Sequence, residues 1–110
     1  MSEARVLVVD DEKSMRDLLA ITLQKAGYDV TLAEGGAAAV EAIRRESFDA
    51  IITDLRMPKV DGLQVLRSAK DLSPDTAVVM VTAMASTETA VEVMKMGACD
   101  YLTKPVKFDE

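Results

Sequence analysis

The sequence predicts an α/β fold in which short buried strands alternate with amphipathic helices. Arg5–Val9 and Ala77–Val81 are continuous apolar runs, which are typical of strands that are buried on both faces. From Lys13 onward, apolar residues recur instead at the three- and four-residue spacing of a helix. The chain has 110 residues, a length that suits one domain. These observations predict a single domain with a parallel sheet at its centre.

The same two periodicities divide the rest of the chain into strands and helices. The predicted strands are Arg5–Val9, Asp29–Ala33, Ala50–Thr53, Ala77–Val81 and Asp100–Thr103. The predicted helices run from Lys13 to just before Gly27 and over Gly36–Arg45, Asp61–Asp71 and Ser86–Met96.

Helical spacing also predicts which side chains of each helix face the sheet. In chain order these are Met15, Leu18, Leu19, Thr22, Leu23 and Ala26; then Ala39, Val40 and Ile43; then Gly62, Val65, Leu66 and Ala69; then Ala90, Val93 and Met94.

Strands and helices that alternate in this way require a parallel sheet with right-handed crossovers and helices on both faces. Five strands favour the flavodoxin-like, doubly wound order 2-1-3-4-5. Only VKFDE follows Pro105, so the final helix of this plan is expected to be missing or truncated. We therefore expect residues 1–110 to be the N-terminal part of a longer chain, with apolar surface uncovered over strands 3 to 5.

Composition excludes several classes of function. The formal net charge of −6 argues against nucleic-acid binding by this segment. The chain contains no histidine, which excludes histidine-ligated metals, Ser-His or Cys-His nucleophile pairs and an internal phosphohistidine. The single Cys99 fits a reducing cytoplasm. No apolar run approaches the roughly 20 residues of a membrane helix, and the N-terminus lacks a signal-peptide pattern.

Polar residues follow the strands that surround the topological switch point. Asp10, Asp11 and Glu12 follow the first strand, Asp54 the third, Thr82 the fourth and Lys104 the fifth. The carboxyl ends of parallel strands meet at one edge of the sheet, where ligands of such folds bind. Taken singly, each residue has an ordinary structural interpretation, such as a helix cap, an Asx turn or a surface lysine. Their joint occurrence predicts a functional site.

The residue types at this edge point to phosphoryl chemistry. Neighbouring aspartates repel one another, and a divalent cation such as Mg²⁺, which prefers oxygen ligands, relieves that repulsion. Asp54 can then remain ionised and act as a nucleophile toward phosphorus, which gives an aspartyl phosphate. Lys104 and the Thr82 hydroxyl would stabilise the equatorial oxygens in the transition state.

The motifs VVDDE (8–12), TDLRMPKVDG (53–62), VTA (81–83) and DYLTKP (100–105) together resemble a response-regulator receiver domain of two-component signalling. The resemblance covers the whole chain and implies phosphorylation of Asp54. It implies that Asp11, Asp54 and the main-chain carbonyl of Arg56 bind Mg²⁺ directly, and that Asp10 assists through water. It also implies that Lys104 pairs with the phosphoryl group.

The resemblance assigns further roles around this site. Thr82 and Tyr101 match the switch pair of the family, in which Thr82 moves toward the phosphoryl group and Tyr101 turns inward. The alternative for Tyr101 is an edge tyrosine with a half-buried ring and a solvated hydroxyl. Pro58 and Gly62 are expected to shape the loop after the site, and the bond before Pro105 is typically cis in the family.

The resemblance also implies partners. A sensor histidine kinase would donate the phosphoryl group, and an output domain or a downstream protein would respond, with a homodimer as a further possibility. Residues 87–105 are similar to receivers of NtrC-like, sigma-54-dependent activators, which favours control of transcription. We expect no direct contact of this segment with nucleic acid or membrane, and a cytoplasmic location.

Three alternatives remain open from the sequence. A phosphatase of the haloacid-dehalogenase kind would also use an aspartate nucleophile, but it wants a second acid two residues later, where Arg56 stands. A flavodoxin-like cofactor binder or P-loop protein would need a glycine-rich phosphate loop, where this chain has acids. A degenerate receiver that serves only as an interaction module would not need the intact set of acids.

Overall fold

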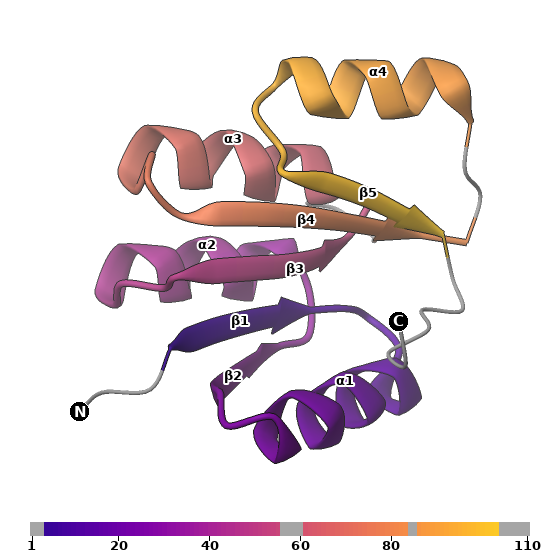
Figure 1. Ribbon diagram of the computed structural model, residues 1–110. Coiled ribbons are helices and arrows are strands. Elements are labelled where there is room, and N and C mark those ends of the chain that lie inside the picture. The colour runs from indigo at the N-terminus through magenta and orange to yellow at the C-terminus, as the bar shows by residue number, and fades with distance from the viewer. Residues whose placement is uncertain (1–3, 56–60, 84–85, 104–110) are drawn as a thin grey trace.

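The computed structural model describes residues 4–55, 61–83 and 86–103. Strands and helices alternate along these residues as the sequence predicts (Figure 1). The strands are β1 (Arg5–Val9), β2 (Asp29–Ala33), β3 (Ala50–Asp54), β4 (Ala77–Thr82) and β5 (Asp100–Thr103). The helices are α1 (Lys13–Lys25), α2 (Gly36–Arg45), α3 (Gly62–Leu72) and α4 (Thr87–Lys95).

The five strands form one parallel sheet in the order β2-β1-β3-β4-β5, which confirms the predicted topology. The register places Val9 beside both Ala33 and Thr53, and Asp54 beside Val81. All strands therefore end at the same edge of the sheet (Figure 1). This edge carries the candidate site.

Helices cover the two faces of the sheet unequally. The larger core cluster joins β-strand residues such as Leu7, Ile51 and Met80 to α2, α3 and α4. The smaller cluster joins Val6 and Val8 of β1 to α1 on the opposite face. Burial of aliphatic surface in these clusters is the main source of stability, since the chain contains few aromatic residues.

On the face that α1 covers, β3, β4 and β5 keep partly exposed apolar side chains. Ile52, Val79 and Leu102 are partly exposed, whereas Val78 and Met80 are fully buried. This agrees with the apolar surface that the sequence predicts over strands 3 to 5. The described residues contain four helices, and the predicted truncation falls in residues 104–110, outside the described part. None of the described helices is long and apolar enough to cross a membrane.

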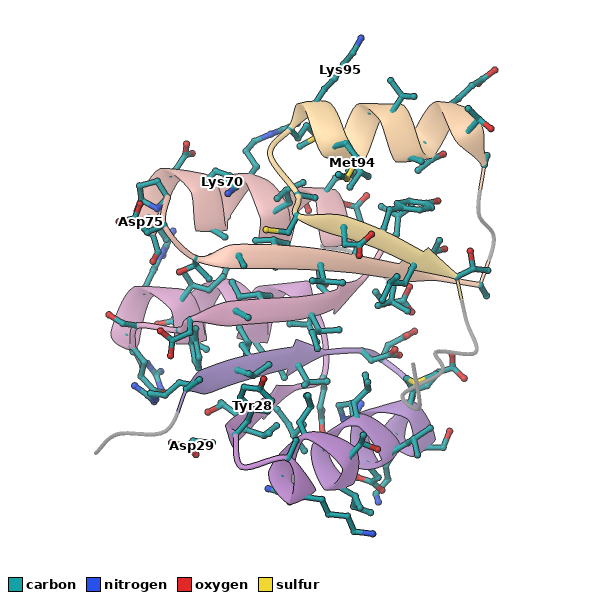
Figure 2. The ribbon with its side chains drawn as sticks, viewed as in Figure 1. Tyr28, Asp29, Lys70, Asp75, Met94 and Lys95 are labelled. Carbon is teal, nitrogen blue, oxygen red and sulfur yellow. The ribbon has the colours of Figure 1, made fainter. Side chains whose placement is uncertain are left out.

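The predicted helix faces are wrong at three positions. Leu18 is 50% exposed, Met94 is 45% exposed, and Ala26 is exposed beyond the end of α1. Both helices lie beside outer strands of the sheet, α1 next to β1 and β2 and α4 next to β5 (Figure 1). Such a helix buries a narrower stripe than the full apolar spacing suggests. Figure 2 shows Lys95 of α4 pointing away from the sheet.

Element boundaries differ from the prediction by one residue at several ends. Asp54 and Thr82 are the last residues of β3 and β4 rather than the first residues after them. Asp61 and Ser86 are the N-caps of α3 and α4. The side chain of each accepts a hydrogen bond from the main-chain N–H three residues later, as is typical of an N-cap. The strand ends matter most, because ladder hydrogen bonds then extend to the site itself.

Candidate functional site

The end of β3 holds Asp54 in a buried position. The residue is 6% exposed, and its main-chain carbonyl accepts a hydrogen bond from the Thr53 hydroxyl at 3.0 Å. The next residue, Leu55, donates its N–H to the carbonyl of Val81 at 3.0 Å. The backbone on both sides of Asp54 is thus tied to β4, and the direction of its side chain is fixed by the sheet.

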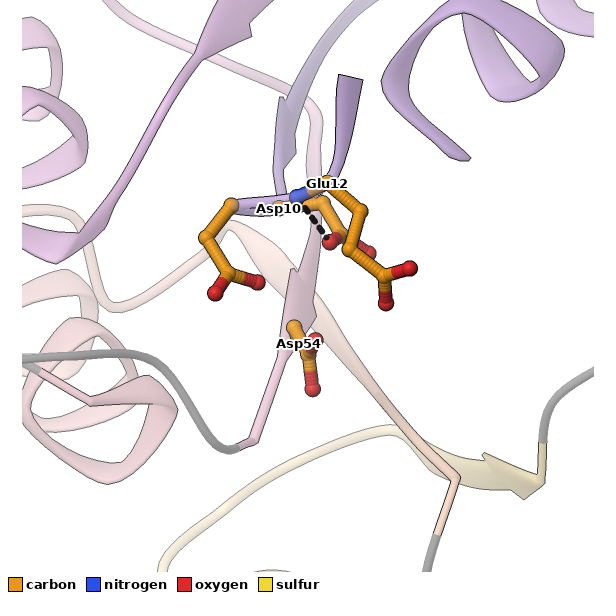
Figure 3. Close-up of side chains that lie close together, drawn as sticks. Asp10, Glu12 and Asp54 are labelled. Atoms are coloured by element: carbon orange, nitrogen blue, oxygen red, sulfur yellow. Dashed lines mark hydrogen bonds between the residues drawn. The ribbon is translucent and has the colours of Figure 1, made fainter. Parts of the chain in front are cut away.

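The end of β1 brings a second buried carboxylate to the same place. Asp10 is 1% exposed, and its N–H donates to the carbonyl of Ala33 on β2 at 3.2 Å. One of its carboxylate oxygens, Oδ1, accepts the N–H of Glu12 at 2.9 Å (Figure 3). This bond spans two residues and forms a tight turn between β1 and α1.

Four acidic side chains meet at this edge of the sheet. Asp10, Asp11, Glu12 and Asp54 each offer a carboxylate oxygen, and these oxygens lie within 4.8 Å of one another. Figure 3 shows the side chains of Asp10, Glu12 and Asp54 around a common space. Glu12 was not among the predicted ligands, although the sequence places it directly after the aspartates. The turn at Asp10 is what brings Glu12 close enough.

This donor set fits a hard divalent cation. Carboxylate oxygens are the preferred ligands of Mg²⁺ and Ca²⁺, and two of the four acids, Asp10 and Asp54, are largely buried at the end of the sheet. The exposed side chains of Asp11 and Glu12 leave the cluster open to solvent on one side. An ion could therefore enter from solvent and keep open coordination positions.

Gly62 packs directly against the end of β3. Its N–H donates to the carbonyl of Leu55 at 2.9 Å. A Cβ atom at this position would lie 2.3 Å from the carbonyl oxygen of Asp54 and 2.8 Å from Cα of Leu55. Backbone atoms cannot yield to a side chain as a flexible neighbour can. The sequence predicts that Gly62 shapes the loop, and the structure gives the reason as a close approach of backbone to backbone.

Thr82 and Tyr101 lie on neighbouring strands near the site. Thr82 is 1% exposed at the end of β4, one residue beyond the register partner of Asp54. Tyr101 pairs with Met80, so the two-residue period of strands places Tyr101 and Thr82 on the same face of the sheet. The Tyr101 ring packs against the larger core cluster, and its hydroxyl is buried, with no hydrogen-bond partner among the residues that the structure describes. The alternative of a solvated hydroxyl is wrong for this conformation.

The sequence analysis missed Arg16, a basic residue beside the acidic cluster. Its Nη1 atom donates to the main-chain carbonyl of Asp10 at 2.8 Å, and its Nη2 atom lies 3.9 Å from Oε1 of Glu34. The Arg16 side chain is only 11% exposed. Helical side chains point back toward the N-terminus, so a long basic residue in the second turn of α1 could have been predicted to reach the end of β1.

Comparison with known proteins agrees with this arrangement. The family model of the response regulator receiver domain matches residues 6–110. This chain belongs to the response regulator receiver family. The transcriptional regulatory protein ZraR of Escherichia coli is 45% identical to it over 104 residues, which are 94% of this chain and 24% of ZraR. The receiver chain thus spans about a quarter of the length of this curated relative.

Solved receiver structures share the fold. A CheY-like receiver domain protein from Methanospirillum hungatei superimposes with a TM-score of 0.92 at 33% identity, covering 96% of this chain and 85% of that one. A response regulator from Burkholderia pseudomallei, solved with a phosphorylated aspartic acid, a calcium ion and citrate, gives a TM-score of 0.91 at 34% identity. It covers 97% of this chain and 63% of the other.

Four predicted site residues of the receiver lie outside the described residues. They are Arg56 and Pro58, which follow β3 in sequence, and Lys104 and Pro105, which follow β5. Their predicted roles as carbonyl ligand, loop residue, phosphoryl partner and cis-proline remain predictions. The described part brings together Asp10, Asp11 and Asp54 and places Gly62 against the backbone of Asp54.

Proposed function

We propose that this receiver domain is a Mg²⁺-dependent phospho-acceptor, and that Asp54 takes a phosphoryl group from the phosphohistidine of a partner kinase. The observation that carries the proposal is the position of Asp54. It is a buried carboxylate at a strand end, inside a cluster of four acids whose oxygens lie within 4.8 Å. A structural aspartate would gain nothing from three acidic neighbours, whereas a nucleophile that acts beside a bound cation would.

The proposed transfer is an in-line displacement at phosphorus. A carboxylate oxygen of Asp54 forms a bond to phosphorus while the bond from phosphorus to the imidazole nitrogen breaks, and the nitrogen keeps the electron pair. The β3 ladder, which extends through Asp54, supports a fixed direction of attack. When bound, Mg²⁺ supplies positive charge that offsets the repulsion between the carboxylates and the phosphoryl oxygens.

Other residues of this chain would stabilise the phosphoryl group and couple its presence to a conformational change. We assign a hydrogen bond from the Thr82 hydroxyl to a phosphoryl oxygen, and a charge interaction to Lys104 as the family resemblance implies. Movement of Thr82 would open space on the face of the sheet that Tyr101 shares. A rearrangement of Tyr101 would then change the surface formed by α4 and β5, and an output partner would recognise that surface.

The partners follow from the chemistry and from the relatives. The chain has no histidine, so a phosphohistidine donor must be another protein, which we take to be a sensor histidine kinase. The name of ZraR as a transcriptional regulatory protein supports a transcriptional output, through further domains or a downstream protein. We place this signalling in the cytoplasm and expect no enzymatic turnover of a substrate beyond phosphorylation and dephosphorylation of Asp54.

A small phosphodonor tests the proposal without the kinase. Incubation with acetyl phosphate and Mg²⁺ is expected to add the mass of one phosphoryl group to the intact protein. Asp54→Asn should abolish this adduct, because the amide is not a nucleophile toward phosphorus. Asp71→Asn is the matched control, since Asp71 is an exposed aspartate of α3 that should not affect the yield. Absence of an adduct on the wild-type protein would refute the proposal.

A further inference from the structure

We infer that Arg16 is a positioning residue for the cation site, because it holds the turn that carries Asp10, Asp11 and Glu12. This inference rests on the proposed function, since it concerns the same acidic cluster. Arg16 touches the main chain of Asp10 at 2.8 Å and would act on the cation only through the acids.

The hydrogen bonds that hold the turn between β1 and α1 include three described below, two of which involve Arg16. The Glu12 N–H donates to Oδ1 of Asp10 at 2.9 Å, and the Arg16 N–H donates to the Glu12 carbonyl at 3.1 Å. The third bond runs from Nη1 of Arg16 to the Asp10 carbonyl at 2.8 Å. Only this third bond depends on the side chain of Arg16, so a substitution removes it and leaves the main-chain bond in place.

The burial and charge of Arg16 support the inference. The Arg16 side chain is only 11% exposed, so it has given up most of its contact with water, and the bond from its guanidinium to the Asp10 carbonyl partly compensates for that loss. Its positive charge lies at the end of β1, where acidic side chains gather. The contact with Glu34 is weaker, because Oε1 is 3.9 Å away and Glu34 is 87% exposed.

Residues that orient metal ligands in this way strongly affect metal affinity, and their loss typically weakens binding about 10- to 100-fold. We therefore expect Arg16→Ala to raise the dissociation constant for Mg²⁺ about 10-fold. Arg16→Lys should recover part of this loss, since lysine keeps a charged donor but lacks the planar guanidinium. Arg67→Ala is the matched control, because Arg67 is an exposed arginine of α3 and its loss changes the net charge equally.

Isothermal titration of each variant with MgCl₂ measures the affinity, and acetyl phosphate labelling at rising Mg²⁺ measures its consequence. A positioning role predicts that labelling of Arg16→Ala approaches the wild-type rate once Mg²⁺ saturates the site. A merely structural role predicts a slower rate that excess Mg²⁺ does not restore, and that outcome would overturn the inference.

Two further outcomes separate this inference from the proposed function. If wild type binds Mg²⁺ and is labelled, but Arg16→Ala has the same Mg²⁺ affinity as Arg67→Ala, the inference fails and the function stands. If wild type binds Mg²⁺ with the expected dependence on Arg16 but Asp54 is never labelled, the function fails and the inference stands. Should Arg16→Ala not fold, the comparison between Arg16→Lys and Arg67→Ala decides in the same way.

Discussion

Two acidic residues with little access to solvent define the site at the scale of single residues. Asp10 and Asp54 are 1% and 6% exposed, and buried charges are costly unless they are paired or bind a metal. Their backbones are anchored to neighbouring strands, so the acids cannot simply move apart. The proposed cation and phosphoryl group would bind at these two acids, and for this reason we propose Asp54 as the nucleophile.

Gly62 allows us to test how closely α3 must approach Asp54. We expect Gly62→Ala to destabilise the protein by about 1–3 kcal/mol, because the added Cβ would meet backbone atoms of Asp54 and Leu55. Urea unfolding measures the change. Gly35→Ala is the control, since nothing lies within 4 Å of a Cβ at that position, and it should change stability by less than about 1 kcal/mol. Equal effects of the two substitutions would contradict the argument.

The buried hydroxyl of Tyr101 predicts an effect of the opposite sign. A buried hydroxyl without a partner costs free energy, so Tyr101→Phe should leave stability unchanged or raise it by about 1 kcal/mol. Thermal unfolding of the unphosphorylated protein is the measurement. Tyr28→Phe is the control at a tyrosine that is 40% exposed, where we expect no change. A clear loss of stability in Tyr101→Phe would show that the hydroxyl has a partner in solution.

At the scale of elements, the predicted strands and helices agree with the structure in kind, order and sheet topology. Short apolar runs and helical spacing are local signals, and the alternation of elements then leaves few possible arrangements. The convergence of Asp10, Asp11 and Asp54 was predictable for the same reason, since parallel strands end at one edge. The prediction thus extended from the elements to most of the acidic site.

Features that depend on tertiary packing were not predictable. Leu18 and Met94 have the correct spacing for a buried face but lie exposed, because their helices cover outer strands. Glu12 joins the acids only through the turn at Asp10. Spacing along a chain does not encode how far a helix overlaps a sheet or how a turn folds a neighbouring residue into a site.

The N-cap of α3, Asp61, gives a prediction about how much the start of this helix contributes to the stability of the protein. Asp61 accepts a hydrogen bond from the Gln64 N–H at 3.2 Å, and this helix begins with the glycine that packs against Asp54. Asp61→Ala should therefore destabilise the protein by about 1 kcal/mol, whereas Asp61→Asn keeps the acceptor and should cost less. Urea unfolding compares the two variants, and equal stability of Asp61→Ala and wild type would argue against a role of this cap in solution.

At the scale of the whole molecule, the doubly wound topology explains why distant segments form one site. β1 lies between β2 and β3 in the sheet although β2 follows it in sequence, and this order brings the ends of β1 and β3 together. The fold supplies the energy that holds the acids close, and the acids oppose the fold by repelling one another. Under the proposed function, a bound cation would offset this repulsion and so link stability to function.

This link predicts that Mg²⁺ stabilises wild type more than it stabilises Asp10→Asn. Without divalent cations, Asp10→Asn should be more stable than wild type by roughly 1 to 3 kcal/mol, because one of four close charges is removed while the Oδ1 acceptor is kept. With Mg²⁺ at 100 times its dissociation constant, wild type should gain about 2.7 kcal/mol. Asp10→Asn should gain less stability from Mg²⁺. The difference in stability between the two proteins should therefore shrink or reverse.

Thermal unfolding across a Mg²⁺ titration measures this effect, and NaCl at matched ionic strength is the essential control. The chain carries a formal net charge of −6, so any salt will relieve some general repulsion. A specific site requires that Mg²⁺ stabilise wild type against thermal unfolding much more than NaCl does. It also requires that this difference between Mg²⁺ and NaCl be smaller for Asp10→Asn. If NaCl reproduces the gain, or if both proteins gain equally from Mg²⁺, the four acids do not form a specific cation site.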